Sequence, residues 1–162
     1  MREIGSMANK VVSIEQAKAI IYGWKLIGKT TSFTNGCFDI LHQGHIFSLG
    51  QAAKEADYLI VGLNSDASVQ RLKGPTRPIN NTDSRAMVIS NLAIVDLVVV
   101  FEEDTPLELI KALMPDILVK GGDYTLEQIV GAKEVVAAGG KVIINPIVEG
   151  FSTTGLIEKI KK

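Results

Sequence analysis

Hydrophobic residues fall along the chain in short, nearly continuous runs separated by stretches with helical periodicity. Five of the runs have the length of strands, and several are rich in Val and Ile. They are residues Thr31–Asn35, Tyr58–Leu63, Leu97–Phe101, Ile117–Lys120 and Lys141–Pro146. Runs without polar alternation are typical of strands that helices cover on both faces. The pattern therefore predicts an α/β fold with a doubly wound, five-stranded parallel sheet.

Local signals predict where several helices begin and end. Three capping boxes mark helix starts, at Ser13 to Gln16, Thr105 to Glu108 and Thr125 to Gln128. Pro106 is predicted at a first helical position, and Gly139-Gly140 is predicted to end the helix before the last strand. The first helix is expected to pack on the sheet through one apolar stripe. The stripe consists of Ala17, Ile20, Ile21, Trp24 and Ile27.

The length suits one domain, which we expect over residues 13–162 after a flexible N-terminus over residues 1–12. Residues 73–81 lack periodicity and combine two prolines, a glycine and two cations. Such a composition predicts a mobile loop, and compact loops with paired cations often bind ligands.

Composition and charge narrow the function classes. The formal net charge is -1, so no basic excess indicates a nucleic-acid partner, and any bound anion needs a local site. The single cysteine, Cys37, excludes an internal disulfide framework and fits a reducing compartment. No apolar run approaches the roughly 20 residues that span a bilayer, and the first ten residues lack the apolar segment of a signal peptide. We therefore expect a soluble, cytoplasmic protein without a membrane partner.

Both histidines of the chain lie in the segment Asn35–His45, where a strand is predicted to give way to a helix. In α/β sheets, ligands bind outside the carboxyl ends of strands and over helix N-termini. His42 and His45 are three residues apart and therefore share a helix face. Gly36 permits a tight turn, and Gly44 lets an anion approach the backbone amides. The segment predicts a polyphosphate site in which the imidazoles stabilise charge on the α-phosphate during in-line displacement.

Simpler interpretations exist for these residues. Either histidine alone would more often be a capping or core residue, but two histidines in one short segment favour a shared site. Their protonation states stay open, because the helix dipole disfavours imidazolium whereas a polyphosphate favours it. Cys37 is expected to be a packed thiol and not a nucleophile, since no third histidine is present to activate it.

The segment Gly36–His45 resembles the signature of the cytidylyltransferase-like nucleotidyltransferases. From about Ser32 to Ile160, the chain resembles most closely the bacterial heptose 1-phosphate adenylyltransferases. The segments that carry this likeness are Asn64–Asp66, Leu72–Pro75, Arg77–Pro78, Lys120–Tyr124 and Glu149–Thr154. The resemblance implies a Rossmann-like nucleotidyltransferase fold that transfers AMP from ATP to D-glycero-β-D-manno-heptose 1-phosphate. The products would be pyrophosphate and ADP-heptose, a precursor of the lipopolysaccharide core.

The resemblance also implies a homodimer. In many bacteria the family is fused behind a sugar kinase, for which this chain has no room, so a separate kinase is expected. We expect Mg²⁺ to be carried by the triphosphate, because the sequence shows no dedicated carboxylate cage, and we assign no metal ligand to the protein.

Individual residues take their expected roles from this resemblance and from their positions. His42, His45 and Lys73 are expected to be catalytic, and the acceptor is expected to contact Lys73, Arg77 and Arg85. The residues expected to bind the nucleotide are Asn35, Gly36, Cys37, Phe38, Asp39, Gly44, Gly121, Asp123, Ser152, Thr153 and Thr154. The alternatives are solvent-facing cations for the three basic residues, an ordinary turn at Gly121–Asp123 and simple helix capping at Ser152–Thr154.

Two departures weigh against a cytidylyltransferase. Enzymes of that kind that use glycerol 3-phosphate carry an arginine where this chain has Ile147, and they tend to have a tryptophan where it has Tyr124. The alternatives are a nucleotidyltransferase for another phosphorylated alcohol, such as glycerol 3-phosphate or FMN, and a non-catalytic nucleotide-binding sensor on the same fold. An aminoacyl-tRNA synthetase fragment is disfavoured by the short chain and the lack of a basic face.

Overall fold

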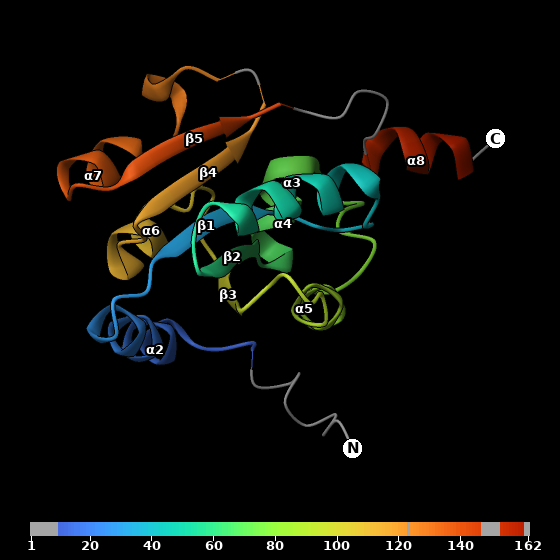
Figure 1. Cartoon of the computed structure of the whole chain (residues 1–162). Helices are drawn as coiled ribbons and strands as arrows, with labels where there is room; N and C mark the ends of the chain where they lie inside the picture. Colours follow the sequence, from blue (N-terminus) through green and yellow to red (C-terminus); the bar gives the residue numbers. More distant parts are fainter. Residues whose placement is uncertain (1–9, 123, 147–152, 161–162) are drawn as a thin grey trace.

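Five parallel strands form the centre of the computed structural model, which describes residues 10–122, 124–146 and 153–160 (Figure 1). The strands are β1 (Thr31–Gly36), β2 (Tyr58–Asn64), β3 (Leu97–Phe101), β4 (Ile117–Gly121) and β5 (Lys141–Asn145). All five predicted strands are confirmed, with starts as predicted and ends that differ by at most one residue.

The helices that connect and flank the strands are mostly short. They are α2 (Ile14–Leu26), α3 (Gln43–Lys54), α4 (Asp66–Lys73), α5 (Thr82–Ser90), α6 (Leu107–Leu113), α7 (Ala132–Ala137) and α8 (Thr153–Ile160), with a 3-10 helix, η1 (Leu126–Gln128), before α7. None of the described helices has the length and apolar character that crossing a bilayer requires.

The strand order is β3-β2-β1-β4-β5, which makes the sheet doubly wound, as predicted. The chain runs outward from β1 through β2 to β3, then crosses back to β4 on the other side of β1. β1 and β4 pair only through Ser32–Ile117 and Phe33–Leu118, so their carboxyl ends separate beyond these residues. Such a switch point creates a crevice between the strand ends, where doubly wound sheets bind ligands.

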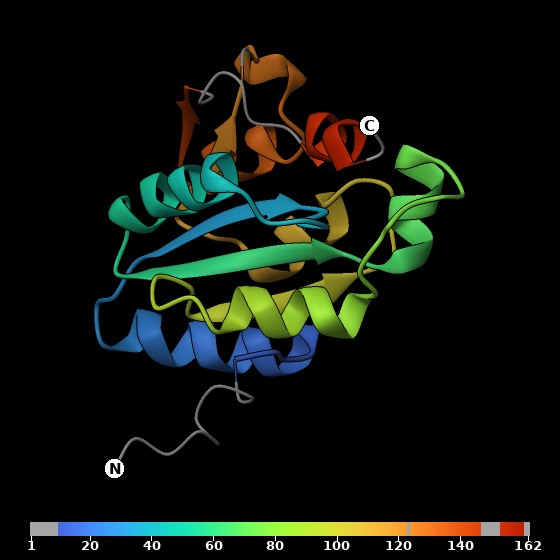
Figure 2. The same cartoon turned by 90° about the vertical axis from the view of Figure 1, so that its right-hand side faces the viewer.

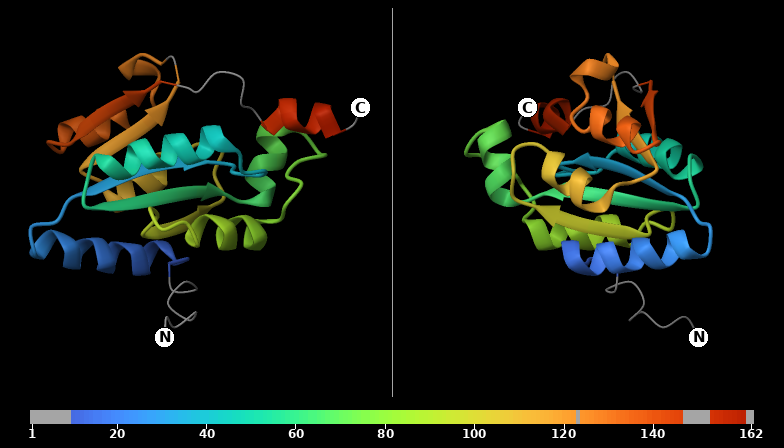
Figure 3. Two further views of the ribbon diagram at one scale, coloured as in Figure 1. Left: turned by 45° about the vertical axis from the view of Figure 1, so that its right-hand side comes forward. Right: turned by 90° about the vertical axis from the view of Figure 1, so that its left-hand side faces the viewer.

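Helices cover both faces of the sheet, which explains the nearly continuous hydrophobicity of the strands. On one face the core contains side chains from α2, α6 and α7, and on the other it contains side chains from α3 and α5. Figures 2 and 3 show the helices arranged around the sheet. Phe33 and Leu118 point to the first face, whereas Val61 and Val119 point to the second. Adjacent residues of one strand therefore serve opposite layers.

The N-terminal segment is attached to the sheet from residue 10. The Val12 amide donates to the Val98 carbonyl at 3.0 Å, and the Val98 amide donates to the Lys10 carbonyl at 2.8 Å. The Lys10 ammonium also donates to the Val95 carbonyl at 2.6 Å. The expectation of a flexible terminus as far as residue 12 is therefore wrong for residues 10–12, because they pair with the edge strand β3.

Two of the three predicted capping boxes form. Ser13 and Gln16 exchange both bonds at the start of α2, and the Thr125 amide donates to Gln128 at the start of η1. The Thr105 box is wrong, because α6 begins at Leu107 with Pro106 as its N-cap. Tertiary bonds hold the preceding segment in place of the local cap, among them one from Ser68 Oγ to the Glu103 carbonyl at 2.8 Å.

The apolar stripe of α2 is confirmed except at its end. Ala17 and Ile21 are buried, and Trp24 stacks on Tyr58 with 3.9 Å between ring centroids. Ile27 is 68% exposed, because it follows the last turn as the C-cap and no longer shares the helix face.

The predicted end of the helix at Gly139-Gly140 is confirmed, and Gly140 packs tightly against its neighbours. Gly139 has φ +86, and the Gly140 amide donates to the Val135 carbonyl at 2.9 Å. A Cβ on Gly140 would lie 2.7 Å from both the Asp116 carbonyl oxygen and Val135 Cγ1. No side chain fits here without moving the start of β5.

We predict that Gly140→Ala lowers the free energy of unfolding by about 1–3 kcal/mol, the usual cost of overpacking. Gly23→Ala is the matched control, because a Cβ there meets nothing within 4 Å and lies inside α2. The control should raise stability by about 0.5–1 kcal/mol. Urea unfolding of both variants measures the difference, and a Gly140→Ala variant as stable as the original chain would contradict the packing described.

Candidate active site

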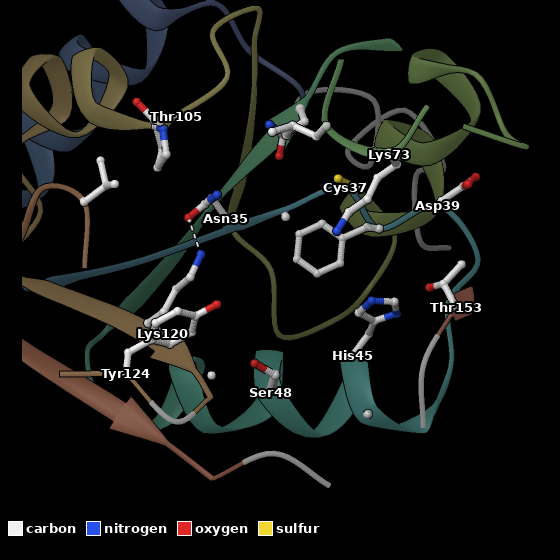
Figure 4. A pocket seen from close by; sticks show the side chains of 18 of the residues that line it. Asn35, Cys37, Asp39, His45, Ser48, Lys73, Thr105, Lys120, Tyr124 and Thr153 are labelled. Atoms are coloured by element: carbon white, nitrogen blue, oxygen red, sulfur yellow. Dashed lines mark hydrogen bonds between the residues drawn. The ribbon is translucent and has the colours of Figure 1, made fainter. Parts of the chain in front are cut away.

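A cleft of about 720 Å³ opens at the carboxyl ends of β1 and β4 (Figure 4). It has the size of a pocket for a nucleotide-sized ligand. The predicted site residues that line it are Asn35, Gly36, Cys37, Phe38, Asp39, His42, Gly44, His45, Lys73, Arg77, Gly121 and Thr153. Asp123 and Ser152 lie outside the described residues, and so does the side chain of Thr154.

In the turn after β1, the residue with a strained backbone conformation is Phe38 and not a glycine. Phe38 has φ +44, in the left-handed region that L residues rarely adopt. Its ring packs against the backbone of Gly36, where an added Cβ would lie 3.0 Å from Phe38 Cε2. Gly36 therefore contributes space for the ring, and the expectation that it supplies the conformational freedom of the turn is corrected. Phe38 in turn contacts His45 edge to face, with 5.4 Å between centroids.

His42 and His45 lie together at the start of α3. Their rings stack with centroids 3.8 Å apart and planes 22° apart. His42 is the N-cap by its backbone, with φ -143, but its side chain makes no capping bond within the described residues. His45 Nδ1 is buried and has no hydrogen-bond partner in the described part of the chain. An unsatisfied buried nitrogen beside a helix N-terminus is suited to a bound ligand.

Burial sets the charge of the histidine pair. It lowers the pKa of His45 to about 4, and the neighbouring charge of His42 adds to the decrease. Burial also lowers the pKa of His42. Both rings are therefore neutral near pH 7 in the free protein, and each presents one N–H donor and one acceptor nitrogen. For the free protein, the lowered pKa values therefore favour neutral imidazoles.

Asp39 anchors the segment that follows α4. Its carboxylate accepts from the amides of Ile79 at 2.8 Å and Asn80 at 2.9 Å, and from Arg77 Nε at 2.6 Å. Burial by itself would raise the pKa of Asp39, but these bonds outweigh it and lower the pKa. The expectation of a mobile loop over residues 73–81 is therefore wrong for Lys73, which is the last residue of α4, and for residues 77–80, which are bonded to the turn.

The two predicted loop cations differ in their surroundings. Lys73 is the last residue of α4, and its side chain reaches into the cleft (Figure 4). No ion pair of Lys73 occurs within residues 10–122, 124–146 and 153–160. The Arg77 side chain is only 12% exposed and pairs with Asp39. Of the two cations, Lys73 is therefore better placed than Arg77 to pair with a ligand in the cleft.

Arg85 takes a role that the sequence did not predict. It is 1% exposed and does not line the cleft. All five of its N–H donors bond to protein acceptors, so none is left for a substrate. The acceptors are the carbonyls of Cys37, Asn64 and Asn80, Asp66 Oδ1 and Thr82 Oγ1. Both interpretations, an acceptor contact and a solvent-facing cation, are corrected: Arg85 holds the turn, the end of β2 and the loop together.

Cys37 and Thr153 lie at the same end of the cleft as the histidines. Burial raises the pKa of the Cys37 thiol, and the nearby Lys73 only partly opposes this, so the thiol is protonated and suited to packing. Thr153 opens α8, and its hydroxyl donates to the Ile40 carbonyl at 3.5 Å. This contact ties the start of α8 to the turn before α3.

Several residues that were not among the predicted site residues also line the cleft. They include Ser48, Asn64, Thr105 and Lys120. Ser48 lies three residues after His45 in α3, so helical spacing was a signal for it. Asn64 and Lys120 lie at the ends of strands, where the ligand-binding edge of a parallel sheet was a second signal. Thr105 had no local signal, because only the crossover from β3 brings it to the cleft.

Comparison with known proteins agrees with this geometry. The model of the cytidylyltransferase-like family matches residues 33–159. Among curated proteins, the chain is 55% identical to the bifunctional protein HldE of Caulobacter vibrioides over 93% of its own length, and 54% identical to that of Mesorhizobium japonicum over 99%. It spans about a third of the length of these relatives, 31% and 33% respectively.

Solved structures share the fold. A lipopolysaccharide core biosynthesis protein from Thermoplasma volcanium is 31% identical, with a TM-score of 0.59 over 75% of this chain and 98% of that one. The pantoate-beta-alanine ligase of Francisella tularensis is 17% identical, with a TM-score of 0.60 over 93% of this chain and 76% of the ligase, a likeness of fold alone. With the signature turn at the switch point of the sheet and a family match over most of its length, this chain belongs to the cytidylyltransferase-like family.

Proposed function

We propose that this chain is an adenylyltransferase that transfers AMP from ATP to D-glycero-β-D-manno-heptose 1-phosphate, with ADP-heptose and pyrophosphate as products. The high identity to HldE proteins supports the acceptor, together with the motif segments that resemble heptose 1-phosphate adenylyltransferases. The likeness to a lipopolysaccharide core biosynthesis protein supports the expectation that the ADP-heptose product is a precursor of the lipopolysaccharide core. Cytoplasmic location and homodimerisation stay predictions.

The observation that carries the proposal is the stacked pair His42 and His45 at the N-terminus of α3, inside the switch-point cleft. A helix N-terminus presents amide donors and the positive end of the helix dipole, which together favour phosphate. The two imidazoles add side-chain donors at the same place. This arrangement suits a triphosphate whose α-phosphate lies against the histidines.

The proposed reaction is a direct in-line displacement. An oxygen of the sugar phosphate attacks the α-phosphorus of ATP, the new O–P bond forms, and the bond to the β-phosphate oxygen breaks to release pyrophosphate. The attacking phosphate is already ionised near neutral pH, so the reaction needs no general base. The protein therefore contributes orientation and electrostatic stabilisation.

Neutral histidines suit this reaction as hydrogen-bond donors. In the free protein each ring offers an N–H to the α-phosphate oxygens, where charge increases in the transition state. A bound triphosphate then favours the protonated form of the nearer ring. Lys73 lies across the cleft and adds a fixed positive charge. ATP is expected to bind as its Mg²⁺ complex, because Mg²⁺ is commonly held by substrate phosphates with few protein ligands.

Pyrophosphate release tests the proposal directly. The protein should release pyrophosphate from ATP with heptose 1-phosphate much faster than from CTP or with glycerol 3-phosphate or FMN. A preference for CTP and glycerol 3-phosphate would assign a different transferase. ATP binding without pyrophosphate release in any combination would make the chain a nucleotide sensor.

We predict that His42→Ala and His45→Ala each lower kcat by about 100-fold or more, the usual effect of removing one donor to a developing negative charge. Gln43→Ala is the matched control, because Gln43 lies between them in sequence but is exposed and does not line the cleft. The control should keep near-original turnover. A histidine variant that folds normally and turns over like the control would not belong to the mechanism.

The histidine pKa values give a second prediction. In the free protein His45 should titrate near pH 4, and added ATP should raise its pKa, because the triphosphate stabilises imidazolium. His42→Gln should raise the His45 pKa only in part, since it removes the neighbouring charge but leaves the burial. NMR titration of the imidazole carbons measures all three values. A His45 midpoint near 6.5 in the free protein would contradict the buried, stacked arrangement.

A third prediction concerns Lys73. Lys73→Met should lower kcat and kcat/KM for the sugar phosphate by about 10-fold or more, because a charge-assisted contact to the transition state is lost. Lys54→Met serves as the control, since Lys54 is exposed at the end of α3 and outside the cleft. Steady-state kinetics with each substrate varied in turn provides the measurement. Unchanged kcat/KM for the sugar phosphate would exclude Lys73 from contact with the reacting groups.

A further inference from the structure

Lys120 enters the cleft from the sheet face opposite α3. It follows Val119 in β4, beyond Leu118, the last residue of β4 that pairs with β1, where the two strands separate. Side chains alternate along a strand, so Lys120 shares its face with Leu118, which packs in the core with α2, α6 and α7. Gly121 faces the other way, since a Cβ there would lie 3.3 Å from Ser48 Oγ in α3. Lys120 and Gly121, which are adjacent in β4, thus face opposite sides of the cleft. One side receives an ammonium group, and the other receives a residue without a side chain.

Few groups around the Lys120 ammonium compensate its positive charge. Its Nζ donates to Asn35 Oδ1 at 3.4 Å, and none of the described carboxylates forms an ion pair with it. The two described carboxylates that line the cleft are engaged elsewhere, Asp39 with Arg77 and Asp104 with Arg71. Burial lowers the pKa of Lys120, which reflects the cost of the unpaired charge.

A part-buried cation without a carboxylate partner is well suited to an anion. An ammonium group has three donors, so two remain after the bond to Asn35. A phosphate at this position would take up these donors and offset the desolvation of the charge. Figure 4 shows Lys120 and Asn35 at one end of the cleft, with His45 and Thr153 at the other.

The geometry of the in-line displacement indicates which phosphate group Lys120 would contact. In an in-line reaction the attacking and leaving oxygens lie on opposite sides of the phosphorus. The amides at the starts of α3 and α8 favour the triphosphate and the departing pyrophosphate at the histidine end. The attacking oxygen then approaches the α-phosphorus on the side away from the pyrophosphate. With the nucleoside beside Gly121, which faces α3, the side with Lys120 and Asn35 is left for the acceptor, so Asn35 is assigned to the acceptor and not to the nucleotide.

We propose that Lys120, oriented by Asn35, binds the phosphate of the acceptor sugar and directs its oxygen toward the α-phosphorus. This inference rests on the proposed function, since it takes the acceptor to be a sugar 1-phosphate. Lys73 then stabilises the reacting phosphates from the α4 side, while Lys120 selects for an acceptor that carries a phosphate. Loss of Lys120 should therefore act on acceptor binding more than on turnover.

The test compares Lys120→Ala, Lys120→Arg and the original chain in pyrophosphate release, with ATP and heptose 1-phosphate varied in turn. Lys120→Ala should raise KM for the sugar phosphate by about 10- to 100-fold, the effect of losing a charge-assisted bond. KM for ATP should change by less than about threefold. Lys120→Arg should recover part of the loss, because it keeps the charge. Lys133→Ala is the matched control, an exposed lysine of α7 outside the cleft.

A binding measurement separates the inference from a structural role. Calorimetry with heptose 1-phosphate, in the presence of α,β-methylene-ATP, should show the same loss of acceptor affinity in Lys120→Ala. Equal increases in both KM values, or a larger increase for ATP, would overturn the inference, and so would an unchanged KM for the sugar phosphate. If the original chain released no pyrophosphate with any sugar phosphate, the proposed function itself would fail, and the inference with it.

Discussion

Two buried charged side chains, Arg85 and Asp39, hold the turn on which the whole site depends. Arg85 donates to the carbonyl of Cys37 within the turn, and Asp39 accepts from the amides of Ile79 and Asn80 after α4. Fully paired buried groups rigidify their surroundings, whereas removal of one partner leaves the others unsatisfied. This matters because the left-handed conformation of Phe38 persists only where neighbouring contacts impose it. The positions of His42 and His45 follow from that turn.

The pleat of the sheet divides the cleft into two chemical environments. On the α3 side, the helix N-terminus and the stacked imidazoles provide neutral donors and a dipole. On the other side lies the Lys120 ammonium, which donates to Asn35 Oδ1. Because successive side chains of a strand point in opposite directions, Lys120 and Gly121 can serve these two sides from adjacent positions. A two-substrate transfer reaction fits such a division.

The charge distribution fits ligands that carry several negative charges. The chain as a whole has a formal net charge of -1, yet Lys73 and Lys120 both reach the cleft without carboxylate partners among the described residues. In the free protein, burial favours the neutral form of both histidines. Donors already held in place in a partly buried cleft stabilise charge without reorganisation at the moment of reaction. A site suited to anions thus comes from the local arrangement of side chains and not from the overall charge.

Periodicity and motif spacing were enough to predict the five strands, the doubly wound sheet and the position of the histidine segment, because strand propensity, helix caps and short motifs are properties of neighbouring residues. Two of the errors share one cause. The mobile loop and the role of Arg85 were mistaken because their partners lie 40 and 48 positions away in Asp39 and Cys37. The pairing of Lys120 with Asn35 spans 85 positions. Contacts of this range arise when the crossovers bring strand ends together, and no local pattern encodes them.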